Sequence, residues 1–324
     1  MTHTMTPEFR EHTLEIPPSP AGQRLDQALA LALPQYSRSR LAGWIKDGAV
    51  TLDGRPPRGR DLVYGGERVQ LRATVVADES VLPQALPLDL RWEDEQLLVI
   101  NKPVGLVVHP GAGNPSHTLQ NALLAFDPKL ALVPRAGIVH RIDKDTSGLL
   151  VVARTIESHV ALVSQLAERE IEREYLALCL GSVTSGSTVD KPIGRHRTDR
   201  IRMTVRPDGR DAVTHYRVIE RFFAHTWLKV TLETGRTHQI RVHLAHIGHP
   251  LVGDQVYGGR RQLTAGTGVA ARAALAAFRR QALHATRLSL AHPMTGKRVT
   301  VEVPPPADLQ ALLAVLRRDA AAAA

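Results

Sequence analysis

The sequence of 324 residues contains only one cysteine, Cys179. A single cysteine can form neither an internal disulfide nor a multi-cysteine zinc site, so the fold does not depend on an oxidising compartment. The N-terminus lacks an apolar run of signal-peptide length, and no stretch approaches the ~20 apolar residues of a membrane span. We therefore expect a water-soluble, cytoplasmic protein with no membrane partner.

Signature motifs of several enzyme classes are also missing. The chain has no GxSxG elbow, no P-loop and no GxGxxG fingerprint, which excludes the usual serine hydrolases, nucleoside triphosphatases and dinucleotide enzymes. His243, His246 and His249 recur every three residues, but Gly248 and Pro250 interrupt the helix before the third histidine, and there is no HExxH pair. A metal-dependent hydrolase is thus a secondary hypothesis, and the remaining chemistry needs no metal or other cofactor.

Composition and charge indicate a nucleic-acid partner. Apolar residues make up 43% and charged residues 23% of the chain, as in ordinary globular proteins, and its length suffices for roughly two domains. There are 41 Lys and Arg against 32 Asp and Glu, a formal net charge of +9. Codon bias would explain the preference for Arg over Lys, but not the positive excess. A polyanion such as RNA is therefore the expected partner.

Composition also divides the chain into units. The first unit, at the N-terminus (residues 1–18), is polar with several prolines near its end, and we expect it to be a flexible arm. The second has two stretches of helical spacing, the first ended by Pro34 and the second capped by Ser37, followed by two short strands. The third lacks periodicity and predicts a linker. The predicted units are an arm, a small domain, a linker and a large domain: residues 1–18, 19–75, 76–90 and 91–324.

The small domain is basic, with nine Lys and Arg against five acidic residues between positions 20 and 75. Arg38 would lie in the first turn of the second helix, where a cation opposes the helix dipole. RNA phosphates would favour such a cluster, and a solvated basic surface is an equally good alternative.

The order of elements in this domain resembles the S4 RNA-binding module. The resemblance covers some fifty residues and rests on four segments, Arg24-Leu25-Asp26, Ser37-Arg38-Ser39-Arg40, Trp44-Ile45 and Leu52-Asp53-Gly54. It implies that Arg38, Arg40 and Lys46 face RNA. It carries no information about catalysis.

The large domain combines many short apolar runs of strand type with a few helices. Helices are predicted near residues 119–125, 158–168, 238–247 and 268–279, without a steady strand–helix–strand rhythm. We therefore predict an α+β fold. Residues 258–282 form an insertion that we interpret as a peripheral loop and helix.

A charged loop lies between two predicted strands, 137–139 and 149–152. Five ionisable side chains within six residues are costly beside buried segments unless they pair or serve a site: His140, Arg141, Asp143, Lys144 and Asp145. If the loop is extended, Arg141 and Asp143 point the same way. The chemistry alone leaves three alternatives equally open: a nucleophilic carboxylate, a metal site through His140 and Asp143, and an ion-pair turn.

Two further segments bear on the chemistry. In residues 232–241, a strand, a turn and a helix N-terminus gather hydrogen-bond donors where anions are favoured, which predicts a second cationic site. Cys179 lies in the apolar run from Tyr175 to Leu180 with no cationic neighbour, so we interpret it as a buried strand residue.

The charged loop is one of several segments that resemble a single enzyme family. His140-Arg141-Ile142-Asp143-Lys144-Asp145-Thr146-Ser147-Gly148-Leu149 is similar to the signature HRLDxxTSGL of pseudouridine synthases of the RluA class. Further segments agree in the same order along the chain: 100–103, 105–110, 173–175, 235–241 and 250–254. With its S4-like domain, the chain is most similar to the D-type enzymes of large-subunit ribosomal RNA. Ile142 replaces the usual leucine, a volume-conserving change.

This resemblance implies a fold with a central mixed, mainly antiparallel sheet flanked by helices and loops. It implies that uridine in RNA is isomerised: the C1′–N1 bond breaks, the uracil turns, and a C1′–C5 bond forms without a cofactor or metal. Asp143 would be the essential carboxylate, acting at C1′ or through a glycal, and Arg241 would pair with it and keep it ionised. Tyr175 would lie against the uracil and assist proton removal from C5.

The same resemblance implies how RNA is held. Arg141 would enter the RNA stack as the target base flips out, and Ile240 would contact the flipped ring. His140 and Arg236 are also expected at the RNA interface. The expected partner is 23S rRNA or its precursor, with the helix 69 loop as target, and a monomer is expected. A non-enzymatic S4-type RNA-binding or ribosome-assembly protein is the alternative.

Overall fold

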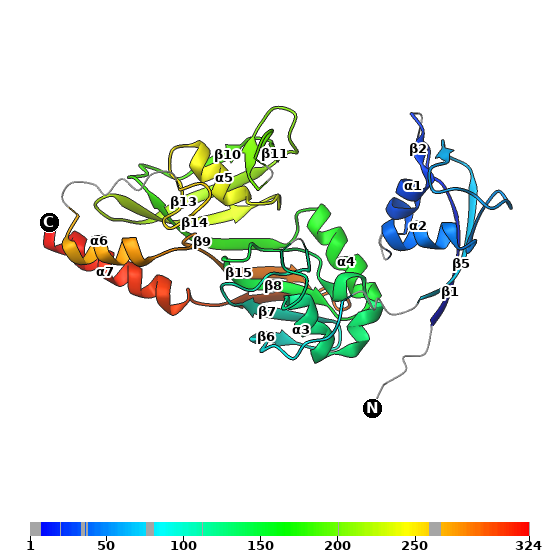
Figure 1. The fold of residues 1–324 in the computed structure, drawn as a ribbon, viewed down its shortest axis with the longest axis horizontal. Helices are drawn as coiled ribbons and strands as arrows, with labels where there is room; N and C mark the ends of the chain where they lie inside the picture. Colours follow the sequence, from blue (N-terminus) through cyan, green and yellow to red (C-terminus); the bar gives the residue numbers. More distant parts are fainter. Residues whose placement is uncertain are drawn as a thin grey trace.

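The computed structural model describes residues 8–19, 21–33, 36, 38–75, 81–111, 113–199, 201–258 and 267–323. Within these residues the chain forms a small N-terminal domain and a larger domain, which Figure 1 shows as two separate bodies. Leu132 of the larger domain packs against the core of the small one. The proposed helix cap Ser37 lies outside the described residues.

The small domain packs two helices, α1 (Leu25–Ala32) and α2 (Arg38–Lys46), on a three-stranded antiparallel sheet. The sheet has the order β1-β5-β3, with β1 at Glu8–Glu15, β5 at Arg68–Val75 and β3 at Val50–Leu52. A short pair joins β2 (Gln23–Arg24) to β4 (Leu62–Val63). Helices and sheet share one apolar core that includes Leu25, Leu29, Leu41, Trp44, Val69 and Leu71.

The prediction of a flexible arm over residues 1–18 is wrong for residues 8–15. These residues form β1, which pairs along its whole length with β5, from Glu8 opposite Val75 to Glu15 opposite Arg68. The strand lacks an apolar alternation because one inward-facing position is His12, whose Nε2 is hydrogen-bonded to the Tyr36 hydroxyl at 2.8 Å. Residues 1–7 lie outside the described part of the chain.

The linker prediction also fails over residues 81–89. Asn121 Nδ2 donates to the Leu82 carbonyl at 2.7 Å, and the Asn121 carbonyl accepts from the Gln84 amide at 3.0 Å. Val81 and Leu88 pack against the main core of the larger domain. This segment therefore belongs to the larger domain, although it has no regular secondary structure. Residues 76–80 lie outside the described residues.

The larger domain is built on one large sheet. Its strands are β6 (Leu90–Glu93), β7 (Leu97–Lys102), β8 (Ser147–Ala153), β9 (Glu172–Leu180), β10 (Ser187–Asp190), β13 (Val213–Arg221), β14 (His225–Leu232), β15 (Leu283–Ala291) and β16 (Arg298–Glu302). The order is β10-β13-β14-β9-β15-β8-β7-β6, and β16 pairs with β15. All these pairings are antiparallel except that of β15 with β8. The predicted mixed, mainly antiparallel sheet is confirmed.

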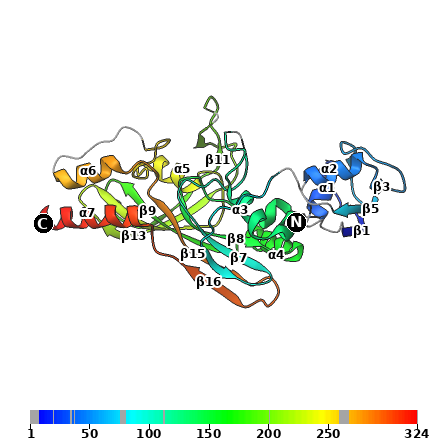
Figure 2. The same cartoon turned by 60° about the horizontal axis from the view of Figure 1, so that its bottom comes forward.

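Helices cover this sheet in separate groups (Figures 1 and 2). They are α3 (Leu119–Phe126), α4 (Ile156–Ala167), α5 (Gln239–His246), α6 (Val269–Ala277) and α7 (Ala307–Ala323), with 3-10 helices η1 (Pro128–Leu132) and η2 (Pro134–Gly137). α3 and α4 lie near β7 and β8, α5 lies beside β13, and α6 and α7 pack together at the far end. A hairpin of β11 (Ile193–Arg195) and β12 (Met203–Val205) stands beside α5. None of the described helices has both the length and the apolar character needed to cross a bilayer.

The middle of the sheet is buried on both faces. Leu98 and Ile100 of β7 face one core and Leu97 and Val99 face another, so the sequence here is a continuous apolar run. The strand predicted at 137–139 does not form. Instead η2 ends in three successive left-handed residues, 135–137, and a Cβ on Gly137 would lie 1.8 Å from the Ala153 carbonyl oxygen. Only glycine fits at this close approach.

Candidate active site

A cleft of about 500 Å³ lies between the charged loop, β9 and the turn that precedes α5. This volume is in the range of small-molecule sites. Of the described residues, two acidic ones line it, Asp143 and Glu233, against a larger set of arginines: Arg135, Arg141, Arg169, Arg173, Arg236 and Arg241. The cleft therefore suits a ligand that carries negative charge.

Asp143 lies in a tight turn just before β8. Its carbonyl accepts from the Thr146 amide at 3.1 Å, and the Lys144 carbonyl accepts from the Gly105 amide at 2.9 Å. β8 then begins beside β15, and a Cβ on Gly148 would lie 2.2 Å from the Ala285 carbonyl oxygen. The turn that carries Asp143 is thus anchored at a position where the two strands approach too closely for any other residue.

Lys102 supports the same turn from within the core. Its side chain is fully buried, and Nζ donates to the carbonyls of Pro103 (2.7 Å), Leu106 (2.9 Å) and Lys144 (2.9 Å). Burial lowers the pKa of Lys102 to about 7, against the opposing effect of nearby carboxylates. Three carbonyl acceptors match the three N–H bonds of an ammonium group. Lys102 therefore fixes the turn and does not line the cleft.

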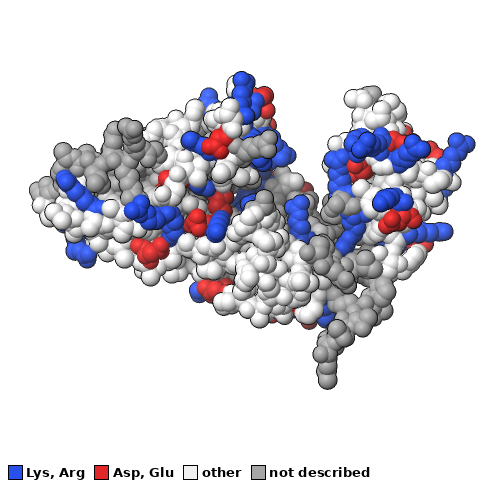
Figure 3. All heavy atoms as spheres, viewed as in Figure 1, with Lys and Arg blue, Asp and Glu red and all other residues white. Residues whose placement is uncertain are grey.

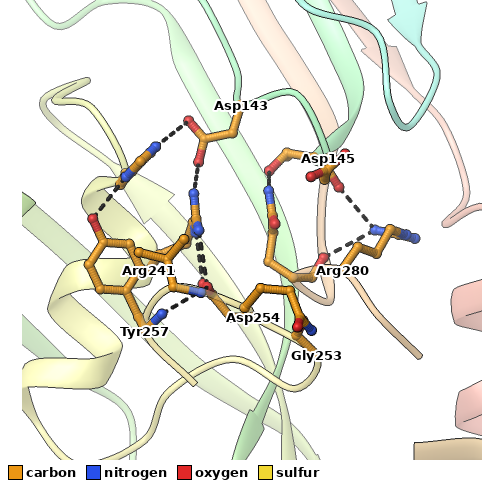
Figure 4. Close-up of polar contacts among 12 residues, drawn as sticks. Asp143, Asp145, Arg241, Gly253, Asp254, Tyr257 and Arg280 are labelled. Atoms are coloured by element: carbon orange, nitrogen blue, oxygen red, sulfur yellow. Dashed lines mark hydrogen bonds and ion pairs between the residues drawn. The ribbon is translucent and has the colours of Figure 1, made fainter. Parts of the chain in front are cut away.

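A buried ion-pair chain holds the Asp143 carboxylate in place (Figure 4). Arg241 Nη1 donates to Asp143 Oδ2 at 2.9 Å. On its other side, Arg241 binds Asp254 through Nε (2.7 Å) and Nη2 (3.0 Å). The side chains are 17% exposed for Asp143, 6% for Arg241 and 0% for Asp254. Of these three side chains, the Asp143 carboxylate is therefore the most exposed to the cleft.

The ion pairs around Arg241 favour the charged forms of Arg241 and Asp254. Burial by itself would lower the pKa of Arg241, but its hydrogen bonds and ion pairs with Asp254 and Asp143 outweigh burial and raise it. Burial would likewise raise the pKa of Asp254, but Arg241 and the backbone amides of Val256 and Tyr257 lower it. Paired in this way, the buried charges satisfy one another and point a carboxylate into the cleft.

Arg241 is positioned by the turn that begins α5. Gln239 Oε1 accepts from the Thr234 hydroxyl at 2.8 Å and the Arg236 amide at 2.9 Å, while its Nε2 donates to the Val213 carbonyl at 2.9 Å. His238 caps the helix with a left-handed backbone (φ 57°). The turn is therefore tied to β13, and the first turn of α5 directs Arg241 toward Asp143.

Three further predicted residues lie in the cleft wall. Tyr175 on β9 is 5% exposed, and burial raises the pKa of its hydroxyl. Ile240 is 4% exposed and belongs to the main core. His140 Nε2 accepts from the Val151 amide at 3.0 Å, and burial, with the nearby Arg173, lowers the pKa of His140 to about 3. His140 is thus neutral and anchors the loop to β8, in addition to lining the cleft.

Comparisons with known proteins agree with this geometry. Residues 96–246 match the family model of RNA pseudouridylate synthase, and residues 23–63 match that of the S4 domain. The protein named "Ribosomal large subunit pseudouridine synthase D" of Xanthomonas campestris is 55% identical, over 95% of this chain and 93% of the relative. The protein of the same name from Pseudomonas aeruginosa is 54% identical, over 95% of this chain and 97% of the relative.

The chain belongs to the RNA pseudouridylate synthase family. It is therefore an isomerase that converts uridine to pseudouridine. An S4 domain precedes its catalytic domain in the sequence. Solved structures agree: human RNA pseudouridylate synthase domain containing 4 has a TM-score of 0.56 and 26% identity, over 71% of this chain and 93% of that one. Human RNA pseudouridylate synthase domain containing 1 has a TM-score of 0.53 and 27% identity, over 69% and 85%.

The two remaining predicted cleft residues of the synthase, Arg141 and Arg236, differ in how exposed they are. Arg141 is exposed and lines the cleft together with Asp143. Arg236 is half-buried, and its Nε donates to the Asp211 carbonyl at 2.9 Å. Burial, together with nearby Arg210, lowers the pKa of Arg236, in keeping with a crowded group of cations.

In the S4 domain, the predicted RNA-facing residues all come from α2. Arg38 is 47% exposed and binds Asp26 through Nε (3.2 Å) and Nη2 (2.9 Å). Arg40 is half-buried, and Lys46 is exposed. Figure 3 shows Lys and Arg gathered on this domain over its helices and on the part of the catalytic domain that faces it.

His243 and His249 have structural partners, and Cys179 is buried. His243 is buried, with ring nitrogens bonded to the Thr214 hydroxyl and the Lys191 carbonyl, both at 2.9 Å. His249 Nδ1 is bonded to the Leu180 carbonyl at 2.9 Å. Among the described residues, no three His, Cys, Asp or Glu side chains are grouped to hold a metal. Burial raises the pKa of Cys179 to about 12, as suits a strand residue in the core.

The residues that hold Arg241 in position were not identified from the sequence. Asp254 ends one of the segments used for the family resemblance, but its bidentate contact with Arg241 depends on the fold. The Tyr257 ring lies 5.0 Å from the Arg241 guanidinium, and its hydroxyl is bonded to His238 Nδ1 at 2.8 Å. The spacing of Arg241 and Asp254 in the sequence gives no signal of this contact.

Proposed function

We propose that this pseudouridine synthase acts on 23S ribosomal RNA, at uridines in the helix 69 loop, with Asp143 as its essential carboxylate. The observation that carries the proposal is the Asp143–Arg241 pair at 2.9 Å, which points a carboxylate into an arginine-lined cleft. The choice of RNA rests on the relatives, which are named for the ribosomal large subunit and share 53–55% of their residues with this chain.

The chemistry follows from the cleft. An ionised Asp143 attacks C1′ and displaces uracil as an anion, or the sugar passes through a glycal; both routes need the carboxylate charged and fixed. The uracil then turns and its C5 bonds to C1′. On the first route this displaces the Asp143 oxygen from C1′, and on the glycal route C2′ regains the proton that Asp143 removed. The C5 proton then leaves and N1 takes up a proton, so atoms and charge balance. Arg241 supports Asp143 through the hydrogen bond from its Nη1 to Asp143 Oδ2. Tyr175 lies where it can contact the base.

RNA binding involves both domains in this proposal. Arg141 enters the space left by the flipped base, and Ile240 contacts its ring, because both side chains line the same cleft as Asp143. His140 and Arg236 complete the RNA-facing wall. Arg38, Arg40 and Lys46 of the S4 domain bind phosphates farther along the RNA, which adds affinity without sequence information.

The role of Asp143 is tested by Asp143→Asn, with Asp145→Asn as the matched control two residues away. We expect isomerisation of a helix 69 stem-loop to fall by about 10⁴-fold or more in Asp143→Asn, while RNA affinity changes little. Asp145→Asn should retain activity. Unchanged isomerisation in Asp143→Asn would refute the assigned role, and RNA binding without isomerisation by the wild type would favour a non-enzymatic RNA-binding protein.

The target is tested in cells. Pseudouridines are mapped across ribosomal RNA from a strain that lacks the gene and from the same strain carrying the wild type or Asp143→Asn. We expect the helix 69 sites to disappear in the deletion strain and to return only with the wild type. Intact helix 69 modification in the deletion strain would overturn the target. Activity in excess EDTA, with intact RNA strands, would eliminate a metal-dependent hydrolase.

A further inference from the structure

One buried arginine in the cleft wall has no counter-charge. Arg173 is 8% exposed, and its Nε has no hydrogen-bond partner. Among the described residues its guanidinium makes one polar contact, from Nη2 to the Glu233 carbonyl, at the limiting distance of 3.5 Å. No carboxylate of the described residues forms an ion pair with it. A buried cation without a counter-charge is costly for the free protein, because no protein anion offsets its lost solvation.

Neighbouring acids are already engaged elsewhere. The Glu233 carboxylate pairs with Arg169 and His215. The two acids beside Arg173 in sequence also pair away from it, Glu174 with Lys229 and Glu172 with Arg298. Since successive residues of a strand point to opposite faces, these acids lie on the other face of β9. The charge of Arg173 is therefore left uncompensated on the cleft side.

The guanidinium lies next to the reaction centre. Arg173 and Tyr175 are two residues apart on β9 and so share one face of the sheet, and both line the cleft. Gly235 lies next to the guanidinium: a Cβ at position 235 would come within 2.8 Å of Arg173 Nη1, so glycine there leaves room for the guanidinium group. His140 of the charged loop and Gly235 of the turn line the same cleft as Arg173.

We propose that Arg173 binds a phosphodiester of the RNA at or next to the target uridine. This inference rests on the proposed function, since it requires RNA in the cleft. A phosphate oxygen is charged in the ground state and accepts charge-assisted hydrogen bonds from a guanidinium, so it supplies both the missing charge and the missing acceptor. The uracil anion, in contrast, exists only during the reaction.

Binding is measured with Asp143→Asn, which holds the RNA without converting it, and compared with Asp143→Asn/Arg173→Met. We expect Arg173→Met to weaken binding by about 10- to 100-fold and to reduce the slope of log affinity against log salt by about 0.7. Arg217→Met, an exposed arginine of β13 outside the active-site cleft, is the matched control and should change little. Arg173→Lys should restore part of the affinity.

The contact is located with stem-loops that carry one neutral methylphosphonate at each linkage around the target. At one linkage, the substitution should weaken binding to the protein with Arg173 and have no further effect when Arg173 is Met. Independent losses of affinity from the methylphosphonate and from Arg173→Met at every linkage, so that their fold-changes multiply, would overturn the proposal. So would an unchanged affinity with a fall in kcat alone, the result expected if Arg173 acts on the uracil anion.

Stability separates this role from a structural one. Because Arg173 is uncompensated in the free protein, we expect Arg173→Met to unfold at the same or a higher temperature than the wild type. A lower unfolding temperature together with unchanged RNA affinity would show that the arginine supports the fold and would overturn the proposal. Failure of the wild type to isomerise the unmodified stem-loop would instead count against the proposed target, and the binding comparison would still decide the role of Arg173.

Discussion

Each domain of this synthase uses a buried aspartate to orient arginine, but the two arrangements differ in how much of the arginine meets solvent. In the catalytic domain, Asp254 binds Arg241, and their side chains are 0% and 6% exposed. In the S4 domain, Asp26 is 7% exposed, while its partners Arg24 and Arg38 are 40% and 47% exposed. Both aspartates accept from the Nε and Nη2 atoms of their arginines, but Arg241 is buried, whereas Arg24 and Arg38 remain exposed.

The difference corresponds to two kinds of task. A buried and fully bonded guanidinium has one geometry, which suits the support of a single reacting carboxylate. Exposed guanidinium groups are screened and mobile, and they suit a long polyanion whose phosphates are contacted in many equivalent ways. We therefore expect changes at Asp254 to affect the chemical step and changes around Asp26 to affect RNA affinity.

The largest effect is expected from Asp254→Asn. This change leaves Arg241 with one charged partner instead of two, at a position where its side chain is 6% exposed. Removing one member of a buried pair typically costs about 3–5 kcal/mol. We expect the free energy of unfolding to fall by about this amount and the single-turnover rate to fall by about 100-fold or more at saturating enzyme. Urea unfolding and rapid-quench measurement of pseudouridine test the two effects. A full single-turnover rate in Asp254→Asn would show that Arg241 needs no support.

The second largest effect is expected from acidification, which should destabilise the catalytic domain at a higher pH than the S4 domain. Burial lowers the pKa of four histidines of the catalytic domain to about 4, against an ordinary value of 6.5: His109, His159, His225 and His284. Between these pH values the unfolded chain binds more protons than the folded one, so stability is complete above 6.5 and is lost as pH falls through 4. Each such group contributes up to about 3 kcal/mol.

Tryptophan fluorescence can follow this loss domain by domain. Trp227 is buried in the catalytic domain and Trp44 in the S4 domain, where His12 is the one histidine with a lowered pKa among the described residues. In single-tryptophan variants, the Trp227 transition should come at higher pH than the Trp44 transition. His225→Phe should move the Trp227 midpoint to lower pH, and the same change at exposed His117 should not. Coincident transitions would contradict the difference between the domains.

Much of this architecture was predictable because the informative patterns are local. The helical spacing in α1 and α2, the apolar run of β8 and the turn before α5 all depend on neighbouring residues. The family resemblance then indicated that Asp143 and Arg241 belong together, and the structure brings them to 2.9 Å. The α+β class followed from the irregular order of strands and helices.

What was missed depends on contacts between distant residues. β1 forms because β5 pairs with it, although its inward-facing His12 breaks the apolar pattern. Residues 81–89 join the catalytic domain through bonds to Asn121. Asp254 and Lys102 stabilise the site through partners that no local pattern reveals. The long helix α7 was not anticipated, and Asp308 at its start pairs with Arg280, which also donates to the Asp145 carbonyl at 3.4 Å (Figure 4).

A smaller effect is expected from the S4 domain, and it should fall on affinity alone. In Arg38→Gln/Lys46→Gln, two cations of α2 are lost, and each phosphate contact removed should reduce the slope of log affinity against log salt by about 0.7–0.9, the range for single strands and duplex DNA. We expect the Kd for a large rRNA fragment to rise, with an unchanged rate constant at saturating enzyme. Binding titrations at several salt concentrations test this. Equal salt slopes for the variant and the wild type would mean that α2 does not contact phosphates.

The smallest effect is expected from Asp26→Asn, the counterpart of Asp254→Asn. Since Arg24 and Arg38 are 40% and 47% exposed, water solvates them when the carboxylate is lost, and the cost should be about 1 kcal/mol or less. We expect the S4 domain to stay folded, RNA affinity to change by less than about threefold and the rate at saturation to stay constant. If Asp26→Asn instead reduced the rate as strongly as Asp254→Asn, the S4 domain would have to position RNA for the chemical step, and the division between a rigid pair for catalysis and an exposed pair for binding would not hold.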